Sequence, residues 1–261
     1  MTIVEHSDVC GRFFEQLRTA SSRALLLDYD GTLSPFTSDR TRAFPYPEIP
    51  ELVSNIMRHK TRVVLISGRA ATELLFLSGI HPHPEIWGSH GAERLYPDGS
   101  YEVELPTPEQ RAGLQIATRS LRAAGMGDWI ETKPVGIAVH WRGLPSSERL
   151  RIESHVRTVC GSVIEHYGLQ LLPFDGGLEL RVPGKNKGDA VETILAESGS
   201  GVTAAYLGDD QTDETAFRAI KRRGCAVLIR PEPRPTDADL WLRPPGELAR
   251  FLRDWLEACG A

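Results

Sequence analysis

The hydrophobic positions of this chain form short apolar runs, separated by longer stretches in which apolar residues recur with a helical period. Four runs are typical of buried parallel strands, because each is almost wholly apolar and ends in polar or glycine-rich sequence. They are Ala24–Leu27, Val63–Ile66, Ala204–Leu207 and Ala226–Ile229. Amphipathic stretches lie between them, such as Glu48–His59 and Asp189–Glu197. Strands that alternate with helices predict an α/β fold with a doubly wound parallel sheet.

The middle of the chain has a different pattern, in which helices alternate with hairpins. The expected helix, hairpin, helix and hairpin are Pro106–Ala124, Trp129–Arg142, Ser146–Tyr167 and Leu169–Val182. The hairpins are expected to turn at Pro134-Val135-Gly136 and at Asp175-Gly176-Gly177. This α+β pattern predicts that residues 107–183 form a domain inserted into one α/β core, which is made of residues 1–106 and 184–261.

The composition allows a normal packed core and gives no sign of a membrane or nucleic-acid partner. Of the 261 residues, 41% are hydrophobic and 25% are charged, and the formal net charge is -5. Nucleic-acid binding usually needs a basic surplus, so we do not expect it. The N-terminus lacks the apolar run of a signal peptide, and no segment approaches the roughly 20 apolar residues of a membrane helix. The chain is expected to be soluble and cytoplasmic.

The first candidate catalytic segment is an apolar strand that ends at two aspartates. Leu25-Leu26-Leu27 leads directly into Asp28, Asp30 and Gly31. In open α/β sheets ligands bind beyond the carboxyl ends of the strands, so both carboxylates are expected at the mouth of a site. The glycine allows a sharp turn of the backbone. An ordinary Asp-Gly turn is the simpler alternative, but the whole string after a buried strand favours function.

A second acidic segment follows another predicted strand and could reach the same edge of the sheet. It reads Gly208-Asp209-Asp210-Gln211-Thr212-Asp213-Glu214. Alone, it would more often be the solvated start of a helix, where carboxylates are favourable. Together, the two segments offer only oxygen ligands, which suit Mg²⁺ better than Ca²⁺ or Zn²⁺. The sequence therefore predicts a magnesium site.

Two further segments supply groups that could hold a phosphate. Ser67, Gly68 and Arg69 follow a predicted strand, where a hydroxyl and backbone N–H groups could bind an anion. Lys187 precedes a helical stretch, and its ammonium group could neutralise a phosphate and a carboxylate together. Each string alone is common by chance. Their order and their positions at the ends of strands and helices give them weight.

These four segments, in this order, resemble the haloacid dehalogenase superfamily of phosphotransferases. The resemblance implies a Rossmann-like core with an inserted cap of the C2 type. It also implies that Asp28 attacks phosphorus to form an aspartyl phosphate, and that Asp30 protonates the leaving alkoxide and then activates water. Lys187 would screen negative charge. The implied Mg²⁺ ligands are Asp28, the backbone carbonyl of Asp30, Asp209 and, in support, Asp213.

A narrower resemblance, to the trehalose-6-phosphate phosphatases, covers nearly the whole chain. The strings that carry it are Gly88-Ser89-His90-Gly91-Ala92-Glu93, Glu131-Thr132-Lys133, His140-Trp141-Arg142, Leu178-Glu179-Leu180-Arg181 and the segment 208–214. The resemblance implies a small-molecule substrate, a phosphorylated disaccharide, and we expect the chain to act as a monomer. The implied substrate-binding residues are Ser67, Gly68, Arg69, His90, Glu93, Glu131, Lys133, His140, Arg142 and Glu179.

The strings of the inserted domain also have a simpler explanation. Glu131 and Lys133 share one face of a predicted strand, as do His140 and Arg142, so either pair could be a solvated ion pair. The two pairs fall on neighbouring strands of one predicted hairpin, however. They could therefore form a single polar patch that binds sugar hydroxyls. For His90, the flanking glycines allow a purely structural turn.

Related functions stay open at this point. A phosphatase for sucrose phosphate, glucosylglycerol phosphate or a pseudo-disaccharide phosphate could carry the same strings. Phosphomannomutases share the first aspartate string and a similar cap, but not the strings that contain histidine. A non-catalytic module that binds sugar phosphates would usually have lost an aspartate or the lysine. This chain retains Asp28, Asp30, Lys187 and Asp209.

Overall fold

The structure is a computed structural model that describes residues 6–37, 39–174, 176–221 and 223–260. The chain divides into two compact units. The first, here called the core, is formed by the segments up to Glu102 and from Lys185 onward. The second, here called the cap, is Val103–Gly184. The inserted domain expected at residues 107–183 lies inside this second unit.

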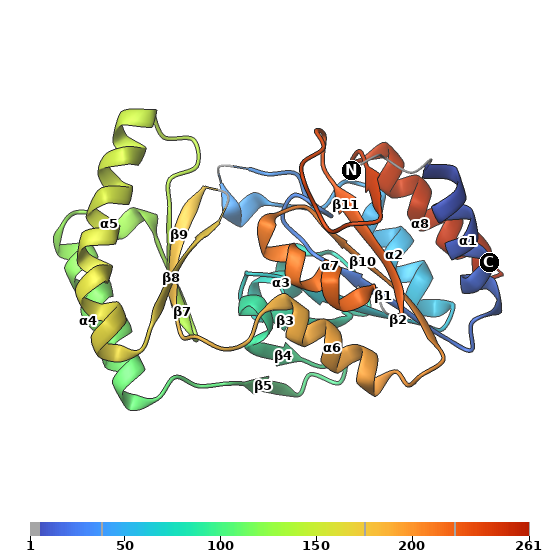
Figure 1. Cartoon of the computed structure of the whole chain (residues 1–261), viewed down its shortest axis with the longest axis horizontal. Coiled ribbons are helices and arrows are strands. Elements are labelled where there is room, and N and C mark those ends of the chain that lie inside the picture. The colour runs from blue at the N-terminus through green and yellow to red at the C-terminus, as the bar shows by residue number, and fades with distance from the viewer. Residues whose placement is uncertain (1–5, 38, 175, 222, 261) are drawn as a thin grey trace. The chain divides into compact units, whose positions relative to one another are not determined.

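The core contains an eight-stranded sheet, counted over the described residues, in the order β12-β11-β10-β1-β2-β3-β4-β5 (Figure 1). Its strands are β1 (Ser22–Leu27), β2 (Thr61–Ile66), β3 (Glu85–Gly88), β4 (Glu93–Leu95), β5 (Tyr101–Val103), β10 (Val202–Gly208), β11 (Gly224–Ile229) and β12 (Leu240–Leu242). β1 lies between β10 and β2 and runs parallel to both, whereas β4 pairs antiparallel with β3. The four predicted strands are confirmed as β1, β2, β10 and β11. Each begins two residues earlier than predicted, because the strand extends over the two residues that precede each apolar run.

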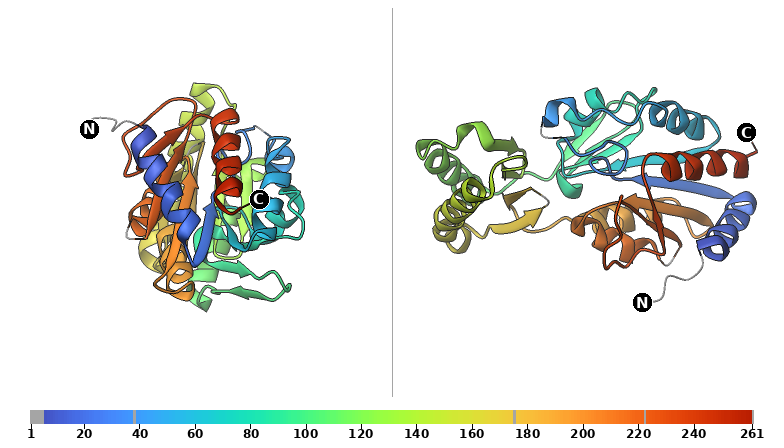
Figure 2. Two further views of the ribbon diagram at one scale, coloured as in Figure 1. Left: turned by 90° about the vertical axis from the view of Figure 1, so that its right-hand side faces the viewer. Right: turned by 90° about the horizontal axis from the view of Figure 1, so that it is seen from above.

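Helices cover both faces of this sheet, as Figure 2 shows. They are α1 (His6–Thr19), α2 (Ile49–Arg58), α3 (Ala71–Leu77), α6 (Lys187–Glu197), α7 (Glu214–Ile220) and α8 (Gly246–Ala258). Leu25 and Leu27 of β1 pack with α1, α2, α3 and α8, while Ala24 and Leu26 pack with α6 and α7. Alternate residues of one strand thus enter two separate hydrophobic clusters. The doubly wound α/β fold is confirmed. None of the helices in the described residues is long and apolar enough to cross a membrane.

In its described residues, the cap is a four-stranded antiparallel sheet with two α-helices on one face. The sheet has the order β6-β7-β9-β8. Its elements are α4 (Pro108–Ala123), β6 (Ile130–Lys133), β7 (Gly136–His140), α5 (Ser146–Tyr167), β8 (Gln170–Phe174) and β9 (Gly177–Arg181). Ile137 and Val139 of β7 pack with α4 and α5 in one hydrophobic cluster. Of the expected second turn, Asp175 lies outside the described residues and Gly177 already belongs to β9.

Candidate active site

The carboxyl ends of the central strands meet at one edge of the core sheet. Leu27 of β1 is paired in register with Leu207 of β10 and with Leu65 of β2. Asp28 follows directly, and its N–H donates to the Leu207 carbonyl at 2.8 Å. Asp209 follows the end of β10 in the same way. The two acidic segments, far apart in sequence, are therefore brought together by the parallel pairing of their strands.

A buried lysine joins the two acidic segments. Lys187 is 3% exposed, and its Nζ donates to Asp28 Oδ1 at 2.6 Å and to Asp213 Oδ1 at 2.7 Å. Thr32 donates to the second oxygen of Asp28 at 3.2 Å, and Tyr206 donates to Asp213 Oδ1. Because a buried carboxylate needs a partner for its charge, this network keeps Asp28 in a fixed position.

The pKa values in this cluster are shifted first by burial and then by the charges that its members exert on one another. Burial raises the pKa of Asp28 to about 7, although Lys187 opposes the shift and Asp213 adds to it. Burial, followed by the charges of Asp28 and Asp213, raises the pKa of Asp209 well above its usual value. Burial alone would lower the pKa of Lys187, but Asp213 and Asp28 raise it instead. Lys187 contacts two of the three carboxylates and Arg230 lies 3.8 Å from the third, so negative charge is still in excess and a further cation would stabilise the charged forms.

The oxygen donors of this cluster fit a small divalent cation. Asp28, Asp209 and Asp213 each offer an oxygen, and these atoms lie within 4.8 Å of one another. Within the described part of the chain, no hydrogen-bond donor contacts the buried Asp209 Oδ2, and Arg230 Nη1 lies 3.8 Å from it. Both oxygens of Asp213 already accept hydrogen bonds. A hard cation held by Asp28 and Asp209, with Asp213 in support, therefore fits the cluster.

Gly31 allows the two acidic loops to approach each other. Its φ is +84°, in the left-handed region that favours glycine, and a Cβ there would lie 2.4 Å from Asp209 Oδ2. Any side chain at this position would push the Asp209 carboxylate out of place. Two features thus require a glycine at this position: the left-handed backbone conformation of the turn and the close contact with Asp209.

Asp30 is held apart from these carboxylates by an arginine. Arg69 Nε and Nη2 donate to the two Asp30 oxygens at 2.6 and 2.7 Å. The Arg69 side chain is almost fully buried, and its Nη1 also donates to the Arg40 carbonyl at 2.9 Å. The sequence predicts Arg69 among the substrate-binding residues, in a segment whose hydroxyl and backbone N–H groups could bind a phosphate, and this stays a prediction. In the free protein the Arg69 guanidinium holds the candidate proton donor, in a bidentate arrangement that strongly orients a carboxylate.

The string that contains His90 folds against the strand-end serine. The His90 N–H donates to the Ser67 carbonyl at 2.9 Å, and Ser67 Oγ accepts from the Arg69 N–H at 3.2 Å. His90 has a φ of 58°, and its ring packs so closely on Gly68 that a Cβ there would lie 2.7 Å from it. Four of the predicted phosphate- and substrate-binding residues thus form one cluster at the end of β2.

Glu93, which the sequence placed among the substrate-binding residues, is buried and engaged inside the core. It accepts hydrogen bonds from Ser89 Oγ, from the Tyr101 hydroxyl at 2.8 Å and from the Ala71 N–H at 3.3 Å. These contacts tie the 89–91 turn to β5 and to the start of α3. The side chain thereby fixes the turn that carries His90.

Four predicted sugar-binding residues gather on one face of the cap sheet. Lys133 Nζ lies 2.7 Å from Glu179 Oε1 and 4.0 Å from Glu131 Oε1. His140 Nε2 lies 2.8 Å from Glu131 Oε2. We call these four residues the cap polar cluster. Arg142 follows β7 and lies against Gly176, where a Cβ would be 3.0 Å from its Nε.

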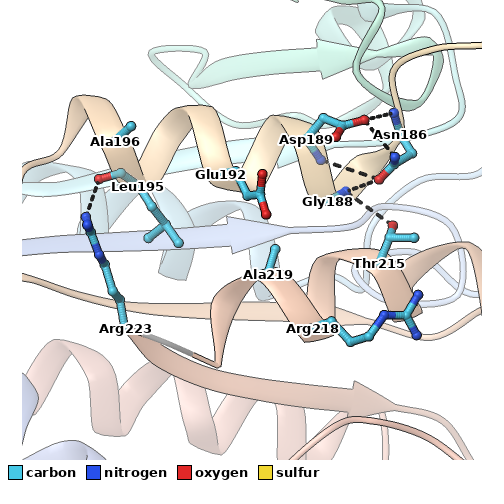
Figure 3. Close-up of a pocket in the computed structure, with 10 residues that line it drawn as sticks. All are labelled: Asn186, Gly188, Asp189, Glu192, Leu195, Ala196, Thr215, Arg218, Ala219 and Arg223. Atoms are coloured by element: carbon cyan, nitrogen blue, oxygen red, sulfur yellow. Dashed lines mark hydrogen bonds between the residues drawn. The ribbon is translucent and has the colours of Figure 1, made fainter.

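Lys187 owes its position to a cap of α6 that sequence reasoning missed. Asn186 Oδ1 accepts from the Gly188 N–H at 2.8 Å and the Asp189 N–H at 3.4 Å, and Asp189 Oδ2 accepts from the Asn186 N–H at 2.8 Å. Figure 3 shows these bonds beside a groove of about 520 Å³ between α6 and α7. Asn followed three residues later by Asp, ahead of an apolar helix, is the sequence signal that would have found this cap.

Comparison with known proteins places the chain in a family. The family model for trehalose-phosphatase matches residues 26–243. The chain belongs to the trehalose-phosphatase family. It is thereby a phosphatase, a hydrolase of phosphate esters, and the narrower family resemblance drawn from the sequence is confirmed.

The chain is also similar to individual plant relatives and to a solved fungal structure. A probable trehalose-phosphate phosphatase C of Arabidopsis thaliana is 30% identical over 96% of this chain and 82% of its own length. A probable trehalose-phosphate phosphatase 3 of Oryza sativa subsp. japonica is 29% identical over 92% of this chain and 72% of its own. The solved C-terminal domain of C. albicans trehalose-6-phosphate phosphatase superposes with a TM-score of 0.77 at 19% identity, covering 96% of each chain. At that identity, the last similarity shows the fold of this trehalose-phosphatase family member.

Proposed function

We propose that this chain hydrolyses trehalose 6-phosphate to trehalose and phosphate, with Asp28 as the nucleophile and Mg²⁺ as the cofactor. Two observations support the proposal. The chain matches the trehalose-phosphatase model over most of its length, and Asp28, Lys187 and Asp209 occupy one buried cluster at the carboxyl edge of the sheet. The single observation that carries the mechanism is this cluster, because it combines a fixed carboxylate with a charge excess that a cation would balance.

Asp28 attacks the phosphorus atom in the first step. One Asp28 oxygen forms a bond to phosphorus as the bond from phosphorus to the sugar oxygen breaks, which leaves an aspartyl phosphate and an alkoxide. Lys187 and Thr32 each hold one Asp28 oxygen, so the carboxylate is oriented before the substrate arrives. Such orientation avoids part of the entropic cost of the attack.

Mg²⁺, held by Asp28, Asp209 and the backbone carbonyl of Asp30 with Asp213 in support, would supply positive charge that screens the repulsion between carboxylate and phosphate. Lys187 also supplies positive charge that screens this repulsion, since its ammonium group contacts both Asp28 and Asp213. Against the effect of burial, Asp213 and Asp28 raise the pKa of Lys187, which favours its cationic form.

Asp30 moves the protons of both steps. It donates a proton to the leaving alkoxide, and then accepts one from the water that hydrolyses the aspartyl phosphate and restores Asp28. Arg69 holds both Asp30 oxygens, so it sets where this carboxyl group stands in the free enzyme. Two carboxyl groups in different environments can divide nucleophilic and acid–base roles between them.

The cap polar cluster recognises the sugar in this proposal. Lys133, Glu131 and Glu179 are nearly buried, and they are paired with one another. Charged groups form strong hydrogen bonds with sugar hydroxyls, so a substrate that offers the matching hydroxyls binds here more tightly than one that lacks them. Trehalose 6-phosphate has a second ring that offers such hydroxyls, and glucose 6-phosphate lacks it.

The test is phosphate release from a panel of esters: trehalose 6-, sucrose 6-, glucose 6-, mannose 6- and glucosylglycerol phosphate. We expect the highest kcat/KM with trehalose 6-phosphate and no turnover by Asp28→Asn at equal protein concentration. A higher kcat/KM for sucrose 6-phosphate or glucosylglycerol phosphate would assign the same chemistry to another substrate. Binding of these esters without any phosphate release would identify a non-catalytic module.

A further inference from the structure

Two arginines of the segment that follows β11 donate hydrogen bonds to the backbone of the loop that carries Asp209. Arg234 donates from Nε to the Asp209 carbonyl at 3.2 Å and from Nη2 to the Asp210 carbonyl at 2.6 Å. Arg230 donates from Nη1 to the same Asp209 carbonyl at 3.2 Å. A single planar guanidinium thus spans two successive carbonyls, a contact that the point charge of lysine cannot make.

The peptide unit between Asp209 and Asp210 is therefore fixed at both ends of its dipole. Its oxygen accepts from the two arginines, and its N–H donates to Asp213 Oδ2 at 2.9 Å. The N–H of the preceding peptide unit, on Asp209, donates to the same oxygen at 3.0 Å. Because peptide units are planar, fixing both units that flank Asp209 also fixes the direction of its Cα–Cβ bond, from which the carboxylate extends.

Arg234 is itself oriented by Glu214, the last residue of the second acidic string. The Glu214 carboxylate accepts from Arg234 Nη1, from Thr236 Oγ1 at 2.8 Å and from the Asp237 N–H at 2.8 Å. The Arg234 side chain is mostly buried, with 16% of it exposed. These contacts join the start of α7 to the segment between β11 and β12. The segment 234–237 is thereby anchored to α7 where it contacts the loop that carries Asp209.

We propose that Arg234, oriented by Glu214, is a positioning residue for the metal-binding carboxylate of Asp209. This inference rests on the magnesium site of the proposed function. Asp209 Oδ2 has no hydrogen-bond donor among the described residues, so its carboxylate depends for its placement on the backbone that carries it, which Arg234 holds together with Arg230. Partners that orient metal ligands typically account for roughly 10–100-fold in metal affinity.

The test is calorimetric Mg²⁺ binding to metal-free protein, with folding checked by circular dichroism. Arg234→Met should raise the Kd for Mg²⁺ roughly 10–100-fold, and saturating Mg²⁺ should return kcat close to the wild-type value. The Kd of Arg234→Lys should lie between those of the wild type and Arg234→Met, since lysine keeps the charge but cannot span both carbonyls. Arg218→Met is the matched control, because Arg218 forms an exposed ion pair with Asp237 on the same segment. Its Kd should stay within about 2-fold of wild type, as exposed pairs contribute little.

The outcomes separate this inference from the proposed function. If the wild-type protein binds no Mg²⁺, the proposed metal site fails. If the wild type binds, Asp209→Asn does not, and Arg234→Met binds as wild type, the metal site stands and the role of Arg234 is overturned. A lower melting temperature of Arg234→Met with an unchanged Kd for Mg²⁺ would also overturn the role of Arg234, because the residue would then serve stability alone. If Arg234→Met does not fold, an unchanged Kd in both Arg234→Lys and Glu214→Gln overturns the inference.

Discussion

At the scale of single residues, the two aspartates of the first string lie in different environments although they are two positions apart. Asp28 is almost fully buried and shares a lysine with Asp213, while Asp30 is half-buried and is held by Arg69. Such a difference allows one carboxyl group to act as a nucleophile and the other to exchange protons. The structure thus supplies a physical reason for the division of roles in the proposed mechanism.

Replacing Asp30 with asparagine tests this division. Asp30→Asn should lower turnover of trehalose 6-phosphate roughly 10²–10⁴-fold, the usual contribution of general acid–base catalysis. With p-nitrophenyl phosphate, whose leaving group needs no proton, one equivalent of nitrophenol should appear in a burst before a slow phase. Stopped-flow absorbance measures this. Wild-type steady-state rates without a burst would remove Asp30 from the second step.

The position of a residue just after a parallel strand predicts that it lies at the site, but not which side chain it pairs with. Asp28 and Asp209 could be predicted together because each follows an apolar strand of a parallel sheet. The pairing of Arg69 with Asp30 could not, since a guanidinium on a long side chain can equally reach a bound phosphate. Arg234 stands in a loop without any motif, and its carbonyl partners come from a segment that precedes it by a whole strand and helix.

At the scale of elements, the cap sheet divides its two faces between packing and polar contacts. Ile137 and Val139 pack with α4 and α5, while Ala138 and His140 lie on the opposite face of the same strand. Ala138 stands in register between Glu131 and Glu179, which leaves room for the longer side chains on either side. The alternation of one strand therefore builds both the hydrophobic core and the cap polar cluster.

Substitutions in this cluster test its role in substrate selection. Glu179→Gln and Glu131→Ala should lower kcat/KM for trehalose 6-phosphate roughly 10–150-fold, the range for one unmatched charged hydrogen bond of about 1.5–3 kcal/mol. Cleavage of p-nitrophenyl phosphate should stay near wild type. Glu153→Ala is the control, because Glu153 forms an exposed pair with Arg157 on α5 of the cap. Equal losses on both substrates would assign the cluster to folding.

Elements were predictable where apolar runs or end signals are strong. The helix Ser146–Tyr167 has the predicted bounds, since Pro145 precedes it and Gly168 ends it with a φ of 60°. β3 was missed because it begins with a charged residue, Glu85. In the fold, Arg62 and Arg94 neutralise that carboxylate at 2.7 and 2.8 Å, and such distant partners leave no local pattern.

At the scale of the whole molecule, the candidate metal site exists only when the core is folded. Asp28 follows β1, whereas Asp209 and Asp213 follow β10, and the helix that begins at Lys187 links them. A ligand that binds only the folded state stabilises it by mass action. Metal binding and global stability should therefore be linked.

Thermal unfolding measures this linkage. At a Mg²⁺ concentration about 100 times its Kd, the folded state should gain about 2.7 kcal/mol. For a chain of this size, that corresponds to a rise of roughly 5–10 °C in Tm. EDTA should abolish the rise, and Asp209→Asn should show none. An equal rise in wild type and Asp209→Asn would place the cation elsewhere.

The role of Asp28 as the nucleophile is tested by trapping the covalent intermediate. Wild-type protein is mixed with trehalose 6-phosphate labelled in its phosphate, quenched in acid within milliseconds, digested and mapped by mass spectrometry. We expect labelled phosphate on the peptide that contains Asp28, and no label on Asp28→Asn treated in the same way. Label on a different residue, or turnover of the ester by Asp28→Asn, would contradict it.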